Sequence, residues 1–286
     1  MDKAISMREM DRVADRIRLH RQSDKRPVVI VEGPSDQRML SRAFSDQDFS
    51  YFSAGTRSLA INAAITLAGW GQRSMACVVD RDFDDVVMEA AKESQSVHAY
   101  ENADMEAMLL VSRVGADLLQ ELGSIGKIET QGGAPAIISR IFEILEPVSR
   151  LRRANSENSW GIAFDAVDLA SKIDKKEMAL KIHSYCMALH QKSSTSPGVK
   201  VLEAYADGSR KINSQPVCPR GSSPYFRGRD FLAALGVALC GYCGSKRPQS
   251  VPVDGLEESL RLAGAYEIRS HPWSDDLLKI LQHQHH

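Results

Sequence analysis

The sequence predicts an α/β protein in which a parallel sheet is sandwiched by helices and is followed by a mostly helical C-terminal region. Two uninterrupted apolar runs, Val28–Val31 and Met75–Val79, are typical of strands that are buried on both faces of a sheet. Segments of strand and helix character alternate at spacings of roughly 25 residues in the first part of the chain. Beyond that part, helical patterns separated by loops rich in Ser, Pro and Gly dominate.

Strand and helix patterns alternate in the first part of the chain. Residues 1–26 have a helical period with a basic face and interleaved acidic residues, which predicts a solvated N-terminal helix. The expected strands are Val28–Val31, Phe49–Ser53, Met75–Val79 and Val97–Tyr100. The expected helices are a segment that ends at Phe44, then Ser58–Trp70, Val86–Glu93 and Ala107–Val111. This order requires parallel strands with helices on both faces.

From about Gly115 the pattern becomes helical. The expected helices are Ala116–Leu122, Ala136–Leu145, Lys175–His190, Phe231–Cys243, Leu256–Leu262 and Asp275–Leu281, with one further strand at Trp160–Phe164 and loops at Ser193–Gly198 and Ser214–Tyr225. The sequence therefore divides into an N-terminal helix (1–26), an α/β core (27–113) and a mostly helical region with loops (114–286), whose end can return to complete the core.

Composition and charge restrict the class of protein. The 286 residues are 43% hydrophobic and 26% charged, as in ordinary soluble proteins with a substantial core. The formal net charge is −1, so any nucleic-acid binding has to come from local patches. The N-terminus lacks the apolar segment of a secretory signal, and the longest apolar stretch, Phe231–Gly244, is shorter than the ~20 residues of a membrane span. Five scattered cysteines fit a reducing compartment, so we expect a soluble cytoplasmic protein with no membrane association.

Acidic residues follow two of the predicted strands. Glu32 comes directly after Val28–Val31, and Asp80 and Asp82 come directly after Met75–Val79. Because the carboxyl ends of parallel strands meet at one edge of a sheet, these side chains are expected to converge there. In an extended Asp80-Arg81-Asp82 segment both aspartates point to the same side. Carboxylate oxygens in this arrangement suit Mg²⁺ or Mn²⁺, which can activate water for hydrolysis of a phosphate ester.

The pattern Val31-Glu32-Gly33-x-x-Asp36 followed by Val79-Asp80-Arg81-Asp82 resembles the TOPRIM fold of topoisomerases, DnaG-type primases and OLD-family nucleases. More narrowly, the segments Tyr100–Leu110 and Arg227-Gly228-Arg229-Asp230-Phe231-Leu232 resemble the TOPRIM effectors of PARIS anti-phage systems, which work beside an ABC-type ATPase. The motif match covers roughly residues 27–111. No topoisomerase tyrosine region or primase zinc domain accompanies it, so the resemblance favours the nucleases.

The resemblance implies a Mg²⁺- or Mn²⁺-dependent endonuclease that hydrolyses RNA, such as tRNA, or DNA. Glu32 would be the general acid or base or a metal-linked carboxylate, and Asp80 and Asp82 would be metal ligands. Asp36 would join the metal ligands, and Glu106, or instead Glu101, would supply the next acidic position. The implied setting is an antiviral, toxin-like effector that acts in abortive infection, associates with an ABC-type ATPase and forms homodimers.

Two other functions stay open at this point. A TOPRIM-shaped protein without catalytic activity would act as a partner or sensor that docks on an ATPase or a phage protein. An Asp-x-Asp pattern after a strand also suits a phosphatase or phosphotransferase, but the sequence lacks a clear pattern of the lysine and Ser/Thr partners for that chemistry. Binding of divalent ions without turnover would favour the first of these.

Two further patterns are weaker signals. Arg227 and Arg229 are the candidate nucleic-acid contacts among several arginine clusters, while the ordinary interpretation of such clusters is a solvated charged face. The Cys240-Gly241-Tyr242-Cys243 segment lacks the companion ligands of a zinc site, so buried thiols are expected there.

Overall fold

Four parallel strands form the main sheet of the computed structural model, which describes residues 7–221 and 223–282. The strands are β1 (Val28–Val31), β2 (Ser50–Ser53), β3 (Met75–Val79) and β4 (Val97–Ala99), in the order β2-β1-β3-β4. The predicted α/β class with a parallel sheet is therefore confirmed, and the bounds of β1 and β3 agree with the prediction. The register places Ile30 of β1 opposite Phe52 of β2 and Cys77 of β3.

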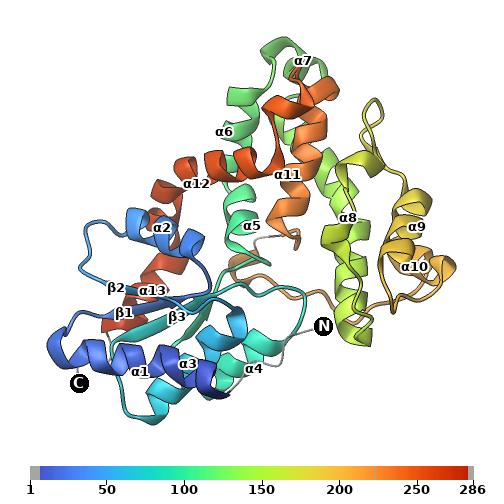
Figure 1. The fold of residues 1–286 in the computed structure, drawn as a ribbon. Coiled ribbons are helices and arrows are strands. Elements are labelled where there is room, and N and C mark those ends of the chain that lie inside the picture. The colour runs from blue at the N-terminus through green and yellow to red at the C-terminus, as the bar shows by residue number, and fades with distance from the viewer. Residues whose placement is uncertain (1–6, 222, 283–286) are drawn as a thin grey trace. The chain divides into compact units, whose positions relative to one another are not determined.

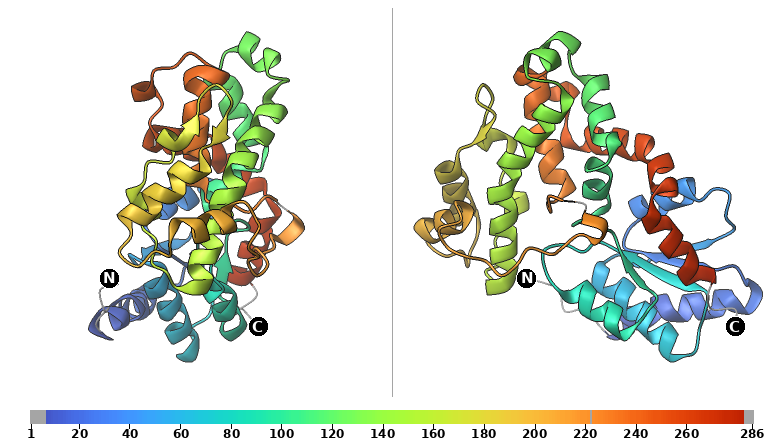
Figure 2. Two further views of the ribbon diagram at one scale, coloured as in Figure 1. Left: turned by 90° about the vertical axis from the view of Figure 1, so that its right-hand side faces the viewer. Right: turned by 180° about the vertical axis from the view of Figure 1, so that it is seen from behind.

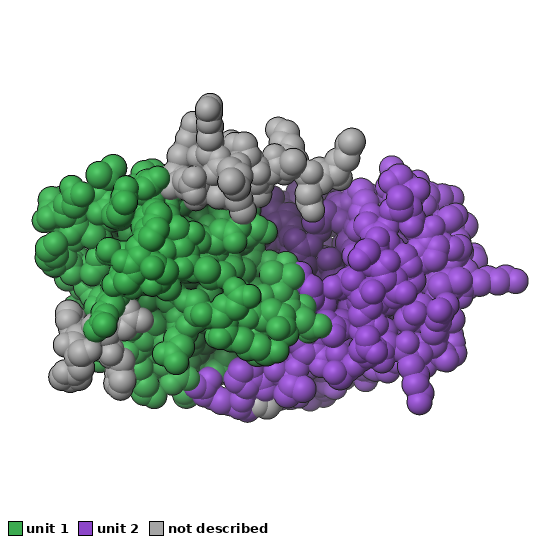
Figure 3. Space-filling view, turned by 90° about the horizontal axis from the view of Figure 1, so that it is seen from below, with its two compact units in different colours: residues 1–81, 85–101, 264–286 green, residues 82–84, 102–263 purple. Residues whose placement is uncertain are grey.

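The chain divides into two compact units (Figure 3). Unit 1 contains the sheet and consists of Met1–Arg81, Asp85–Glu101 and Gly264–His286, and unit 2 consists of Asp82–Asp84 and Asn102–Ala263.

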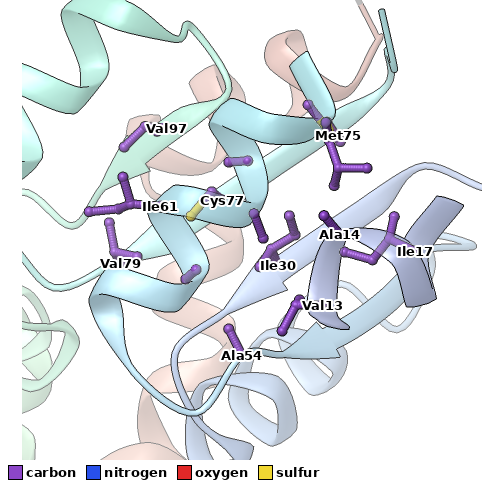
Figure 4. Close-up of a cluster of buried hydrophobic side chains, with 14 of the residues drawn as sticks. Val13, Ala14, Ile17, Ile30, Ala54, Ile61, Met75, Cys77, Val79 and Val97 are labelled. Atoms are coloured by element: carbon purple, nitrogen blue, oxygen red, sulfur yellow. The ribbon is translucent and has the colours of Figure 1, made fainter. Parts of the chain in front are cut away.

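In unit 1 the two central strands are buried along their whole length. Alternate residues, such as Ile30 of β1 with Cys77 and Val79 of β3, pack into a cluster with Ala14 and Ile17 of the first helix (Figure 4). Because side chains alternate across a strand, the remaining residues of β1 and β3 face the opposite side of the sheet. Burial on both faces explains why β1 and β3 consist almost entirely of apolar residues.

Helices cover both faces of this sheet (Figures 1 and 2). Helices α1 and α3 pack against one face, and α2 and α13 pack against the other. The helices of unit 1 are α1 (Met7–Ser23), α2 (Pro34–Ala43), α3 (Arg57–Gly69), α4 (Val86–Glu93) and α13 (Pro272–Gln282). The side chain of Thr56 caps α3 by accepting the Leu59 N–H, as expected of a helix start.

Helix α13 comes from the far end of the chain and lies against the sheet near β4. The Trp273 ring stacks on His98 and Tyr100, with centroid separations of 4.8 and 5.1 Å. Trp273 Nε1 donates a hydrogen bond to the carbonyl oxygen of Ala99 (2.7 Å), and His98 Nε2 donates to that of Trp273 (3.1 Å). These contacts cover the outer strand of the sheet with a helix, one of the ways in which proteins protect strand edges.

Unit 2 is mostly helical. Its elements are α5 (Met105–Leu110), α6 (Arg113–Leu122), α7 (Ile125–Thr130), α8 (Ala134–Asn158), α9 (Ile182–Lys192), α10 (Val199–Ala206), α11 (Gly228–Val237), a short π-helix (Ala238–Tyr242), most of α12 (Val253–Ser270) and a hairpin of β5 (Ile173–Asp174) and β6 (Ala179–Leu180). Helix α11 packs against α5 and α8, and Phe142, Phe226 and Phe231 contact one another there.

Three predictions for unit 2 are wrong. The helix expected at Lys175–His190 begins only at Ile182, because the Asp174 side chain accepts the N–H groups of Lys176 and Glu177 and forms a hairpin turn. No strand forms at Trp160–Phe164, where side chains accept the backbone N–H groups instead. Helix α8 continues past Pro147 to Asn158, whereas a proline normally ends a helix.

Within the described parts of the chain, every helix is too short or too polar to cross a lipid bilayer.

Candidate functional site

Glu32 follows β1 and is held between the two neighbouring strands. Its carbonyl oxygen accepts the Gly55 N–H (2.8 Å) and the Ser53 hydroxyl (3.3 Å), which continues the pairing with β2. On the other side, Glu32 Oε1 accepts the backbone N–H of Asp80 (2.9 Å), the first residue after β3. The Glu32 carboxylate is therefore fixed beside Asp80 at the carboxyl edge of the two central strands, as the sequence predicts.

The residues after Asp80 do not continue the strand. Arg81 is buried, and its Nη1 donates to the carbonyl oxygen of Glu101 (3.4 Å). Asp82 has a φ of 52°, in the left-handed region that non-glycine residues seldom adopt. The extended Asp80-Arg81-Asp82 segment expected from the sequence is therefore wrong, and simple alternation does not place the two aspartates on one side.

Asp36 lies in the first turn of α2 and performs a capping role there. Its Oδ2 accepts the Gly33 N–H (3.2 Å), so that the carboxylate stabilises the start of the helix that follows Glu32. Its Oδ1 accepts a hydrogen bond from the Tyr100 hydroxyl (3.3 Å). Tyr100 itself is buried and stacks on Trp273. These contacts of Tyr100 link α13, the residue after β4 and the first turn of α2.

Two contacts of this edge were missed by the sequence analysis. Tyr100 was interpreted as the last residue of a strand, although as a residue at the carboxyl end of β4 it belongs to the same edge as Glu32 and Asp80. Arg57, which begins α3, donates from Nη1 to the carbonyl oxygen of Arg81 (3.2 Å). A position directly after a strand could have indicated Tyr100, and a position at the start of the helix that follows β2 could have indicated Arg57.

Three of the five predicted metal-binding carboxylates, Glu32, Asp36 and Asp80, belong to unit 1, and Asp82 and Glu106 belong to unit 2. In unit 2 the carbonyl oxygen of Asp82 accepts the Tyr225 hydroxyl. Glu106 is buried and accepts a hydrogen bond from Arg261 Nε (2.8 Å), so an arginine compensates its charge.

Glu101, the alternative to Glu106, is a buried residue of unit 1. Its Oε2 lies 3.9 Å from His271 Nε2. Over residues 7–221 and 223–282, no three or more His, Cys, Asp or Glu side chains form a group that could hold a metal ion. At the strand ends, the contact between predicted site residues is the hydrogen bond from the Asp80 N–H to Glu32 Oε1, and Asp36 lies in the following helix.

The Arg-Gly-Arg-Asp motif at the start of α11 is occupied by contacts within unit 2. Arg227 pairs with Asp165, and Arg229 Nη2 and Nη1 pair with Asp254 (2.7 Å) and Glu257 (3.0 Å). Asp230 receives two hydrogen bonds from Arg152 (2.7 and 2.8 Å). At Gly228 a Cβ atom would lie 2.3 Å from Glu106 Cβ, so this close approach of α11 to α5 requires glycine. Gly228, Arg229 and Asp230 therefore have a structural role in docking α11.

Asp104, the N-cap of α5, completes this docking. Its Oδ1 accepts the Ala107 N–H (2.7 Å), and both carboxylate oxygens accept the Gly228 N–H (3.0 Å each). Burial and, to a smaller extent, the nearby Glu106 carboxylate raise the pKa of Asp104 from its ordinary 3.8 to about 8, against the opposing effect of these N–H donors. The folded chain therefore keeps a proton on Asp104 in a range where the unfolded chain has released it.

We expect the contribution of Asp104 to the free energy of unfolding to decrease as the pH rises from about 4 to about 8. It is fully present below the unfolded pKa and is lost as the pH passes the folded pKa, because the unfolded state binds fewer protons throughout this range. A single proton gives a slope of at most about 1.4 kcal/mol per pH unit. Asp104→Asn cannot titrate, so its profile, measured by urea unfolding between those pH values, should be flatter than that of the wild type. An unchanged slope in the variant would contradict the raised pKa.

The strand-end site has a defined chemical capacity. Two carboxylates at the ends of adjacent parallel strands supply hard oxygen atoms, which are suited to Mg²⁺, Mn²⁺ or the acceptance of a proton. Comparison of the chain with protein-family models, with curated proteins and with solved structures found no match in any of the three.

Proposed function

We propose that the chain is a metal-dependent nuclease with a TOPRIM-like core. The observation that carries the proposal is the 2.9 Å hydrogen bond from the Asp80 N–H to Glu32 Oε1, which fixes two acidic residues at the ends of the central strands β1 and β3. Open parallel sheets generally bind their ligands at this edge. The Glu-Gly-x-x-Asp and Asp-x-Asp motifs that resemble the TOPRIM family directly follow these two strands.

The donor set fits a Mg²⁺ or Mn²⁺ ion. Mg²⁺ in phosphate-processing sites is commonly held by one or two carboxylates together with substrate oxygens and water, and Glu32 and Asp80 would be such a pair. When bound, the ion would polarise a phosphodiester and lower the pKa of an attacking water. Glu32 would accept the proton of that water, and the Asp80 N–H would keep its carboxylate in place. Asp36, which accepts a hydrogen bond from Tyr100, is proposed as a further ligand on the basis of the family resemblance.

The wider setting is proposed from the family resemblance. The substrate would be RNA, including tRNA, or DNA. The chain would act in the cytoplasm as a homodimeric effector of an anti-phage system, beside an ABC-type ATPase. Asp82 and Glu106 remain proposed ligands on the same basis, although Arg261 compensates the charge of Glu106.

A cleavage assay tests the proposal. Purified full-length chain is incubated with tRNA, single-stranded DNA and duplex DNA, each with Mg²⁺, with Mn²⁺ or with a chelator. We expect cleavage of at least one substrate that depends on the divalent ion. Binding of Mn²⁺ without cleavage of any of the three, with and without an ATPase partner, would contradict the nuclease and support the non-catalytic partner or sensor.

Tyr100→Phe is expected to weaken metal use without unfolding the chain. The substitution removes the hydroxyl that donates to Asp36 Oδ1 and keeps the ring that stacks on Trp273. Because a hydrogen bond to a charged group is worth about 1.5–3 kcal/mol, we expect the Mn²⁺ concentration for half-maximal cleavage to rise by roughly tenfold or more. The measurement is a Mn²⁺ titration of the cleavage rate.

Tyr51→Phe is the matched control for this titration. Its hydroxyl also bonds across unit 1, but to the backbone carbonyl oxygen of Leu40 (3.2 Å). This control should leave the Mn²⁺ dependence unchanged. An equal shift in both variants would assign the effect of Tyr100→Phe to general destabilisation.

A further inference from the structure

Unit 2 contains a polar pocket of about 500 Å³ that the proposed nuclease chemistry does not use. Three guanidinium groups, those of Arg152, Arg227 and Arg229, line it, together with the carboxylates of Asp165, Asp168 and Asp230. The volume lies in the range of small-molecule sites. Whether the pocket can bind an anion depends on which of these arginines are already committed to a carboxylate.

Two hydrogen bonds fix the Arg152 guanidinium, and its third nitrogen remains a potential donor. Its Nε and Nη2 bond to the two oxygens of Asp230, and its guanidinium lies 4.5 Å from the centroid of the Phe164 ring. Its Nη1 forms no hydrogen bond with any other residue in the described parts of the chain. The buried pair with Asp230 fixes the direction of this remaining donor, so the donor is already ordered before a ligand arrives.

Arg227 forms a weak ion pair with Asp165. Its Nη1 donates to Asp165, whose side chain is 75% exposed, and exposed ion pairs contribute little to stability. Within residues 7–221 and 223–282, Nε and Nη2 of Arg227 have no hydrogen-bond partner. An anion with two negative charges can therefore replace Asp165 at this guanidinium.

Arg229 differs from the other two. Both of its terminal nitrogens bond to carboxylates on α12, Asp254 and Glu257. Although it lines the same pocket, its guanidinium joins α11 to α12. It therefore provides a comparison residue of the same type and charge.

We propose that this pocket binds the phosphate group of a ligand of mononucleotide size, with Arg152 Nη1 and the Arg227 guanidinium as donors. Guanidinium forks match phosphate oxygens in geometry and charge. A phosphate dianion outcompetes the single charge of Asp165, while Asp168 at the same pocket opposes any anion and limits the affinity. The phosphate belongs either to a free nucleotide or to the end of a nucleic-acid strand.

The residues that line this pocket include none of the five proposed metal-binding carboxylates, so the two proposals can be tested separately. A Glu32→Gln variant should bind the same ligand with the same affinity. Loss of cleavage with retained phosphate binding, or the reverse, therefore separates the two proposals.

Isothermal titration calorimetry of the full chain tests the pocket with four probes: AMP, adenosine, a single-stranded DNA 8-mer with a 5′-phosphate and the same 8-mer without it. We expect a phosphorylated probe to bind at least tenfold more tightly than its partner without phosphate. Preference for AMP identifies a free nucleotide as the source of the phosphate, and preference for the phosphorylated 8-mer identifies a strand end.

Three variants locate the binding. Arg227→Gln should weaken binding of the preferred probe by tenfold or more, and Asp165→Asn should tighten it because the competing carboxylate is removed. Arg229→Gln should change the affinity by less than threefold, since the guanidinium of this arginine binds two carboxylates of α12. Equal binding of probes with and without phosphate, no binding of any probe, or equal losses in Arg227→Gln and Arg229→Gln would overturn the proposal.

Discussion

Replacing Glu32 by alanine is expected to reduce kcat/KM for nucleic-acid cleavage by at least ~100-fold, because general acid–base groups typically contribute that much or more. Alanine removes both the carboxylate and the acceptor of the Asp80 N–H. Glu32→Gln removes only the charge, since the amide oxygen can still accept that N–H. If Glu32 acts through its charge, both variants lose cleavage while glutamine preserves the arrangement of the strand ends.

The measurement is the initial cleavage rate with saturating Mn²⁺, accompanied by the midpoint of thermal unfolding. Glu89→Gln is the matched control: Glu89 is an exposed carboxylate of the same unit, on α4, paired with Lys92 (2.7 Å). It should cleave at the wild-type rate. Wild-type activity in both Glu32 variants would remove Glu32 from the proposed mechanism, and loss of activity in Glu32→Ala alone would limit it to a structural role.

The fold of unit 1 could be predicted because its signals are local. The strands β1 and β3 are short runs of apolar residues buried on both faces, so hydrophobic pattern and secondary structure agree along their whole length. The positions of Glu32 and Asp80 follow from these strands and from the parallel order. The strand pattern and the parallel order were together enough to place this pair at one edge of the sheet.

Contacts between distant segments could not be predicted in the same way. The backbone at Asp82 turns into the left-handed region three residues after β3. Asp adopts this region more often than most residues, but nothing in the pattern Asp80-Arg81-Asp82 requires it. Tyr100 donates to Asp36, and its ring stacks on Trp273 of α13, more than a hundred residues later in the sequence. The sequence placed α13 at Asp275–Leu281, after this tryptophan, whereas the helix is Pro272–Gln282.

The arginines of the motif in α11 show a further limit. In the sequence, Arg227 and Arg229 are equivalent candidates for binding nucleic acid. In the structure they differ, because Arg229 has two carboxylate partners on α12 and Arg227 has one exposed partner, Asp165. The carboxylates that pair with these arginines lie 25 to 62 positions away in the sequence, and they decide which guanidinium can still bind a ligand. The charge pattern along the sequence does not show which distant carboxylate will pair with which arginine.

Trp273→Ala is expected to be the most destabilising single substitution proposed for unit 1. The side chain is 1% exposed, stacks on His98 and Tyr100, and donates Nε1–H to the carbonyl oxygen of Ala99. Truncation of a buried tryptophan leaves a large cavity and costs about 3–5 kcal/mol. The loss should appear in urea unfolding and as faster hydrogen exchange of the β4 amides, because α13 is held against this strand by these contacts.

Two further variants separate packing from hydrogen bonding. Trp273→Phe keeps a stacking ring and loses the N–H donor, so it should cost about 1–3 kcal/mol, the penalty for leaving the Ala99 carbonyl group without this partner. Trp70→Ala is the control: Trp70 is 42% exposed and lies under Arg18, with 4.9 Å between the guanidinium carbon and the ring centroid. It should cost no more than about 1 kcal/mol. If Trp273→Ala were as mild as this control, α13 would not be required for the stability of the sheet, and the path from Trp273 through Tyr100 to Asp36 would lose its physical basis.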